Sequence, residues 1–360
     1  MVQLVLNRKN TWLVLACAVL FGLTPLCASK RPKTKPAEAP PELLLNDGRK
    51  LVWENSFTSD RDIEKKPGFW TKVLNVIAGE PDHYFMVRPY SVVVDSHGRA
   101  IIIDPGARGI HVFDFEHHKY KFIARRNEKN GLQSPQCVAV DSADNIYVTD
   151  SEAGKIFVFE PSGKFKRVIG SLKGGEGFFK RPTGIAVDSA AQRIYVADTL
   201  RDQVFVLDMK GDVLQTIGKH GSAVGEFNFP TELRLEGNSL AVVDAMNFRV
   251  QVMDLSGNVQ YVIGKLGDET GEMFRPKGIG FDSEGHLYVV DGLWGVVQVF
   301  NREGQLLYYF GQKGTGFGEF QLPSGLFIDR RDKVFVVDSF NRRVQVFQYY
   351  GVAKPVRAGQ

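Results

Sequence analysis

Residues 181–218 read RPTGIAVDSAAQRIYVADTLRDQVFVLDMKGDVLQTIG, and this stretch decides the fold. A proline opens two short apolar segments that each end in aspartate, and an alternating third segment and a fourth ending in glycine follow. The proline recurs at intervals of 46 to 48 residues, at Pro89, Pro135, Pro182, Pro230, Pro276 and Pro323. A fixed period in the forties with several short strands per period is typical of a β-propeller, in which each repeat forms one blade.

The sequence therefore predicts an all-β fold, a six-bladed β-propeller of four-stranded antiparallel blades. The repeats lie near residues 88–125, 134–170, 181–218, 229–264, 275–311 and 322–351. The last repeat stops after its third strand, and Thr71–Gly79, which reads TKVLNVIAG, matches the fourth strands of the other repeats. We expect this N-terminal strand to join the last blade and close the ring, because closure removes exposed sheet edges.

Gly-rich links join the later repeats, and each contains a large side chain. We expect these side chains to fill the space between neighbouring blades, and the candidates are Phe178, Phe227, Met273 or Phe274, and Phe320.

The chain starts with a pattern typical of a secretory signal peptide over residues 1–29, where Arg8 and Lys9 precede an apolar stretch and small residues. An uncleaved membrane anchor is an alternative, and so is lipid attachment at Cys17 or Cys27. We expect an exported protein that is periplasmic or associated with the cell envelope.

Residues 30–50 begin KRPKTKPAEAPPE and predict a disordered tether that could hold the protein near a membrane. The propeller is expected over 51–351, with a C-terminal tail at 352–360. Residues 1–50 hold eight Lys/Arg and three Asp/Glu, whereas residues 51–360 hold 37 Lys/Arg and 38 Asp/Glu. The propeller as a whole thus lacks the positive charge that attracts polyanions, and we expect no nucleic-acid partner.

These repeats resemble the NHL repeat family. Residues 181–218 match its pattern nearly throughout, and DAMNFRVQVM and DSFNRRVQVF contain the Asn-x-Arg-Val element that is the family's most specific part. The resemblance covers 88–351 and is looser in the inner strand of the fourth repeat, where Glu236 replaces the usual Asp. It implies a propeller but not one activity, because function depends on sites added to the fold.

Two enzyme classes with similar propellers are the alternative. Resemblance to peptide-amidating lyases implies histidines directly after the opening prolines, but those positions hold Tyr90, Gln136, Thr183, Thr231, Lys277 and Ser324. The histidines lie elsewhere, at His83, His97, His111, His117, His118, His220 and His286. Resemblance to gluconolactonases implies an Arg-Pro-Asn-Asp segment, which the sequence lacks. We therefore expect no catalytic residue, no metal and no cofactor, with a lyase or hydrolase as the alternative.

A single aspartate ends the second strand of every repeat. These residues are Asp104, Asp150, Asp198, Asp244, Asp291 and Asp338. Because every blade has one, we interpret them as structural carboxylates that bond turn amides or a nearby arginine. Cys137 lies on an inner strand where other repeats have glycine, and we interpret it as a small buried side chain.

Two loops of each blade open where the inner strand begins, and we call this end of the propeller the mouth face. The predicted ligand-binding residues there are Arg88, Tyr90, Arg181, Arg275, Lys277 and Trp294. Further residues expected on this face are Arg108, Arg201, Arg249, Arg342, Arg343, Phe248 and Phe340, and pairing with the aspartates is the alternative role of the arginines. Trp294 stands out because DGLWG departs from the repeat pattern.

Basic and aromatic residues in a concavity suit an acidic or sugar-like ligand. We therefore expect a non-enzymatic scaffold that binds a protein partner or an extended acidic or sugar-like ligand through the mouth face.

Overall fold

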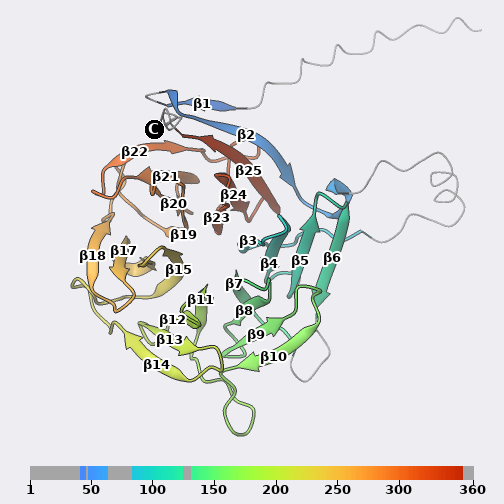
Figure 1. Cartoon of the computed structure of the whole chain (residues 1–360). Coiled ribbons are helices and arrows are strands. Elements are labelled where there is room, and N and C mark those ends of the chain that lie inside the picture. Colours follow the sequence, from blue (N-terminus) through green and yellow to red (C-terminus); the bar gives the residue numbers. More distant parts are fainter. Residues whose placement is uncertain (1–40, 46–47, 64–82, 125–130, 352–360) are drawn as a thin grey trace, which may run out of the picture. The chain divides into compact units, whose positions relative to one another are not determined.

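The computed structural model describes residues 41–45, 48–63, 83–124 and 131–351, and its strands form six antiparallel sheets around a central axis (Figure 1). Five sheets have four strands and the sixth has five. The only helical turns in the described residues are two short 3-10 segments, Asp60–Asp62 and Ala245–Asn247. The predicted six-bladed β-propeller is confirmed.

Blades one to five follow the chain order from the inner strand at the axis to the outer strand. Blades one to three contain β3 (Ser91–Val94), β4 (Ala100–Asp104), β5 (Gly109–Asp114), β6 (Lys119–Ala124), β7 (Pro135–Val140), β8 (Ile146–Asp150), β9 (Lys155–Phe159), β10 (Phe165–Ile169), β11 (Pro182–Asp188), β12 (Arg193–Asp198), β13 (Gln203–Asp208) and β14 (Val213–Ile217). Blades four and five contain β15 (Pro230–Glu236), β16 (Ser239–Asp244), β17 (Arg249–Asp254), β18 (Val259–Ile263), β19 (Pro276–Phe281), β20 (Leu287–Asp291), β21 (Val296–Phe300) and β22 (Leu306–Phe310). Blade six contains β23 (Leu326–Ile328), β24 (Lys333–Asp338) and β25 (Arg343–Tyr350), together with β1 (Glu42–Leu44) and β2 (Lys50–Phe57).

An N-terminal strand closes the ring, as predicted, but it is β2. This strand pairs with β25 from Lys50 opposite Tyr350 to Phe57 opposite Val344, and β1 covers its other edge. The strand expected in this position, Thr71–Gly79, lies outside the described residues. Because β1 and the start of β2 fall within 30–50, the structure also differs from the predicted tether there. The predicted signal peptide (1–29) and tail (352–360) lie outside the described residues.

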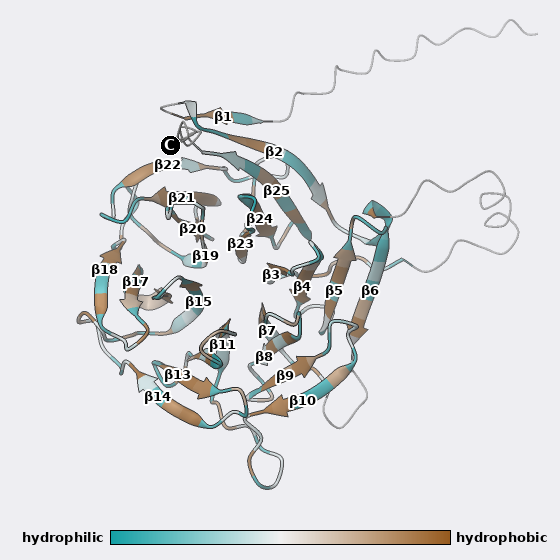
Figure 2. Ribbon diagram, in the orientation of Figure 1, coloured by the Kyte–Doolittle hydropathy of each residue, from teal (hydrophilic) through white to brown (hydrophobic). Residues whose placement is uncertain are grey.

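The core is divided into six apolar clusters, one between each pair of neighbouring blades. The middle strands are apolar on both faces because both faces of a blade are covered, and Figure 2 shows them largely brown. Phe227 and Phe320 fill the space beside the links as predicted, each with 0% of its surface exposed. Of the alternatives Met273 and Phe274, Met273 is buried and Phe274 is exposed. One expected member is corrected: Phe179 is buried, whereas Phe178 is half-buried.

The strand-end aspartates hold the loops of the mouth face. All six have 0% exposed surface. Asp104 accepts hydrogen bonds from the backbone amides of Val87 and Arg88, just before the inner strand of its own blade. The other five accept equivalent bonds from amides of Gln133 and Ser134, Lys180 and Arg181, Asn228, Phe274 and Arg275, and Gln321. One carboxylate thus fixes the two loops of a blade at the same end.

Replacement of Asp338 by alanine should destabilise the propeller by about 3 kcal/mol or more, because it removes the carboxylate partner of the largely buried Arg343 guanidinium and an acceptor of several further donors. Asp338 accepts from the Arg343 guanidinium at 2.7 Å, from the Asn341 amide at 2.8 Å and from the Gln321 backbone amide at 2.7 Å. Urea unfolding followed by circular dichroism measures the change. Asp268→Ala, at an exposed position, is the control and should change stability by about 0.5 kcal/mol or less.

Replacement of Phe57 by alanine tests β2 as the closing strand. Phe57 is 2% exposed, and its ring lies 4.8 Å from that of Phe113 in blade one. Loss of this ring should lower the free energy of unfolding by about 3–5 kcal/mol. Leu214→Ala, which removes a side chain 55% exposed on β14, should have little effect. Equal effects of the two substitutions would contradict the position of β2.

Candidate functional site

Local backbone irregularities direct side chains toward the axis at the mouth. The inner strands of blades two to five each contain a register shift directly after the opening proline, as between Pro276 and Ile279 in β19. Such bulges re-aim the side chains that they contain. In β19 the shifted residues are Lys277 and Gly278, and in β15 they are Thr231 and Glu232. A small cavity at this point is lined by Tyr90, Thr231, Glu232, Lys277, Gly278, Ser324 and Gly325.

Four of the six predicted binding residues form one electrostatic cluster. The Lys277 ammonium lies 5.6 Å from the centre of the Tyr90 ring. Burial, followed by repulsion from Arg275 and Arg181, lowers the pKa of Lys277 to about 8. Both arginines are exposed, and within the described residues neither guanidinium forms a hydrogen bond or an ion pair. We call Tyr90, Arg181, Arg275 and Lys277 the mouth cluster.

The other two predicted residues lie on the loops of the mouth face in separate contacts. The Arg88 guanidinium lies 5.4 Å from the ring of Phe340. Trp294 is 38% exposed, and its ring lies 5.3 Å from the Lys313 ammonium. No contact within the described residues joins either one to the mouth cluster.

Three of the remaining arginines have structural partners. Arg249 and Arg343 donate to the strand-end aspartates of their blades, at 2.8 and 2.7 Å, and also to loop carbonyls. Arg201 lies 3.5 Å from Asp198. These three arginines pair with strand-end aspartates, which is the alternative role considered in the sequence analysis. Arg108 and Arg342 are exposed.

The sequence analysis did not predict that Glu232 is a buried acid below the mouth cluster. Glu232 of β15 is 7% exposed and accepts a hydrogen bond from the Cys137 thiol at 3.4 Å. Burial raises the pKa of Glu232 above its usual range, although the Arg234 guanidinium 3.7 Å away opposes this shift. Other blades have small residues in its place, such as Gly184 and Cys137, so the charge at this repeat position was the available signal.

Arg234 spans the axis from blade four to blade six. Its guanidinium donates to the carbonyls of Ile279 at 3.1 Å and Leu326 at 2.8 Å, and it lies 5.3 Å from the Phe327 ring. Glycine leaves room for the neighbouring acid, since a Cβ on Gly184 would lie 2.8 Å from Cα of Glu232. Charged side chains therefore connect non-adjacent blades beneath the mouth cluster.

Cys137 is a buried hydrogen-bond donor. It is 2% exposed, and burial followed by the charge of Glu232 raises the pKa of its thiol to about 12. A protonated thiol can donate to the carboxylate but is a poor nucleophile. This environment favours a structural role.

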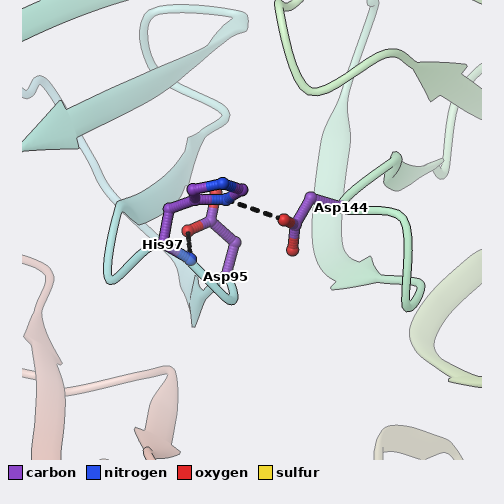
Figure 3. Close-up of side chains that lie close together, drawn as sticks. All are labelled: Asp95, His97 and Asp144. Carbon is purple, nitrogen blue, oxygen red and sulfur yellow. Dashed lines mark hydrogen bonds and ion pairs between the residues drawn. The ribbon is translucent and has the colours of Figure 1, made fainter.

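A second cluster lies at the opposite end of the inner strands, in the turns after β3 and β7 (Figure 3). It joins Asp95, His97 and Asp144, whose ligand atoms lie within 4.8 Å of one another. The protein already supplies donors to both acids: the Arg99 guanidinium lies 2.6 Å from Asp95, and His97 Nδ1 lies 2.9 Å from Asp144. The cluster fits an inter-blade contact better than a cation site, because these donors take the lone pairs that an ion would need.

Comparison with protein families agrees with this architecture. A family model described as a 6-bladed beta-propeller matches residues 186–270, and the NHL repeat model matches residues 132–159. The chain is a six-bladed β-propeller, and it carries an NHL repeat, as the sequence resemblance indicated. None of the curated proteins matches the chain by sequence.

Solved structures with a similar fold have different activities. One is a catalytically inactive virginiamycin B lyase from Staphylococcus aureus with quinupristin, 15% identical, with TM-score 0.52 over 76% of this chain and 87% of that one. Another is an auxiliary nutrient binding protein from Bacteroides thetaiotaomicron, 15% identical, with TM-score 0.58 over 75% of this chain and 70% of that one. A hydrazine synthase of Kuenenia stuttgartiensis is 14% identical, with TM-score 0.53 over 74% and 96%. At these identities the similarity concerns the fold alone.

The described residues include no helix with the length and apolar character needed to cross a membrane.

The lowered pKa of Lys277 can be measured by labelling its amine with acetic anhydride at a series of pH values and quantifying the products by mass spectrometry. Only the neutral amine reacts, so labelling of Lys277 should reach half its maximum near pH 8. Lys265 is the control, because its hydrogen bond with Glu272 raises its pKa. Arg275→Ala should move the Lys277 midpoint upward. Identical midpoints for the two lysines would contradict the proposed environment.

Proposed function

We propose that the chain is a non-enzymatic, exported binding scaffold whose mouth cluster binds an anionic group of its ligand. The observation that carries this proposal is the convergence of Arg181, Arg275 and Lys277 around Tyr90. Burial is the main cause of the lowered pKa of Lys277, and repulsion from the two arginines lowers it further. An anion placed among them would remove the mutual repulsion and favour the charged form of the lysine.

The form of the site also supports binding of an anion. The two guanidinium groups are exposed and have no partner among the described residues, so they are available to a carboxylate or phosphate. Glu232 lies below the mouth cluster, and its charge opposes part of the lowering of the Lys277 pKa. Binding proteins and enzymes both occur among the similar structures, and export rests on the sequence of residues 1–29.

A lyase or hydrolase remains the second candidate, but no observation favours it. Among the described residues, the one group with metal-ligand distances is Asp95, His97 and Asp144, and it lies at the other end of the inner strands. The thiol of Cys137 is buried and protonated.

Isothermal titration with inorganic phosphate, and separately with succinate, tests the proposal at low ionic strength. Arg275→Ala and Lys277→Met should each weaken binding about tenfold or more, because each removes a charged partner of the anion. Binding to the wild type should also weaken as the pH rises through about 8, since Lys277 then loses its proton, and Lys277→Met should abolish this pH dependence.

Arg331→Ala is the matched control, because Arg331 is exposed in the turn after the inner strand of blade six, away from the mouth face. No detectable anion binding by the wild type, or an equal loss with Arg331→Ala, would refute the site.

A further inference from the structure

Exposed apolar side chains lie on the loops of the mouth face. We call six of them the rim arc: Phe229, Met246, Phe274, Trp294, Phe340 and Val87. Between 38% and 53% of the surface of each is exposed. They come from blades four, five, six and one. Blade three has one exposed apolar residue on the corresponding loops, Leu200, which is 48% exposed, whereas blade two has the polar residues Gln133 and Glu152 there.

Hydrogen bonds place the members of the rim arc at the same end of the propeller. The backbone amide of Met246 donates to the carbonyl of Asn228 at 3.0 Å, which joins the two mouth loops of blade four. Two ring contacts continue across blade boundaries: Phe248 lies 6.2 Å from Phe274, and Arg88 lies 5.4 Å from Phe340. The exposed side chains thus follow adjoining loops.

Large apolar side chains that gather on a surface mark an interaction site more often than scattered ones do. The strand-end aspartates accept hydrogen bonds from the loops that carry the rim arc. The exposed side chains therefore extend from loops whose backbone is held in place. Aromatic residues of this kind are the usual anchors of protein interfaces.

The charges of the rim arc identify the kind of partner. Arg88 and Arg275 lie on its loops and Lys277 lies close by on β19, and none of the three forms an ion pair among the described residues. By contrast, the acids Glu226 and Glu272 of the neighbouring links pair with Lys219 and Lys265. The uncompensated charge is positive, so a partner with complementary potential is acidic.

We propose that the rim arc and the mouth cluster together bind an acidic segment of a protein partner, with apolar side chains on the arc and a carboxylate among the cations. This inference rests on the proposed anion site and names its ligand class. The chain's own segment KRPKTK at residues 30–35 is a poor occupant because it is basic. RNA is disfavoured because the propeller has a net charge near zero, whereas polyanion binding depends on a large positive surface.

Selection from a display library of short random peptides on the purified full-length chain tests the inference. The enriched peptides should be net negative and contain apolar or aromatic residues. One enriched peptide is then synthesised, and its affinity is measured by fluorescence polarisation. Trp294→Ala combined with Phe340→Ala should weaken it about tenfold or more, because two aromatic anchors are lost.

The matched control combines Leu214→Ala and Tyr309→Ala, which remove side chains 55% and 52% exposed on the outer strands β14 and β22. It should leave peptide affinity unchanged, and thermal unfolding should show that all variants retain the fold. The docking surface is overturned if no acidic peptides are enriched, if the control loses as much affinity, or if a random single-stranded RNA pool binds more tightly at the same salt concentration.

The two proposals can fail separately. Phosphate binding that depends on Lys277, without enrichment of acidic peptides, would retain the anion site and overturn the docking surface. Peptide binding that needs Trp294 and Phe340, without phosphate or succinate binding by the wild type, would retain the rim arc as a docking surface and overturn the anion site. Peptide binding that is unchanged in Arg275→Ala and Lys277→Met would overturn the combined use of the rim arc and the mouth cluster.

Discussion

A buried carboxylate at the end of the second strand organises each blade. Its oxygens accept hydrogen bonds from backbone amides of the loop that enters the same blade, as Asp198 does from Lys180 and Arg181. An ionised acid that receives several such bonds is stable in a dry interior, but it becomes costly when its donors are lost. Because the loops of the mouth face are tied to these carboxylates, the side chains on them extend from an ordered rim.

Beneath this rim, two charged residues of blade four depart from the pattern that the repeats share. Glu232 and Arg234 occupy β15, where other inner strands have small or apolar residues, and Arg234 reaches carbonyls of blades five and six. A buried ion pair rarely adds stability compared with apolar packing. Its position under Lys277 suggests another role, because the charge of Glu232 offsets part of the repulsion among the cations above it. The acid and the mouth cluster are best understood as one electrostatic unit.

The sequence predicted the features that repeat and missed those that occur once. Proline spacing identified the blades, and the recurring aspartates were correctly placed at the ends of second strands. The closing strand was misplaced because β2 reads KLVWENSF and lacks the glycine ending of other fourth strands. It also pairs with a strand far away in the sequence, whereas the other fourth strands directly follow their third strands. Phe274 and Met273 are adjacent, and only packing decides which one enters the core.

The candidate site was predicted in part for the same reason. Arg181, Arg275, Lys277 and Tyr90 follow from their positions beside the prolines, but the bulge of β19 that contains Lys277 was not predicted from the sequence. Glu232 was detectable as an acid at a repeat position that otherwise holds small residues, whereas Glu236, four residues further on, takes the place of the usual aspartate.

Regular positions explain why this chain is a propeller, and a lyase, a synthase and a binding protein share that fold. The function of an individual propeller must therefore depend on residues that depart from the repeat. In this chain several departures lie at the mouth or on the axis near it: Glu232 and Arg234 on β15, Lys277 on its bulge, and Trp294 on the rim, whereas Glu236 lies at the other end of β15. Departures without a function have no reason to gather on one face, so those four make the mouth face the first place to look for a working surface.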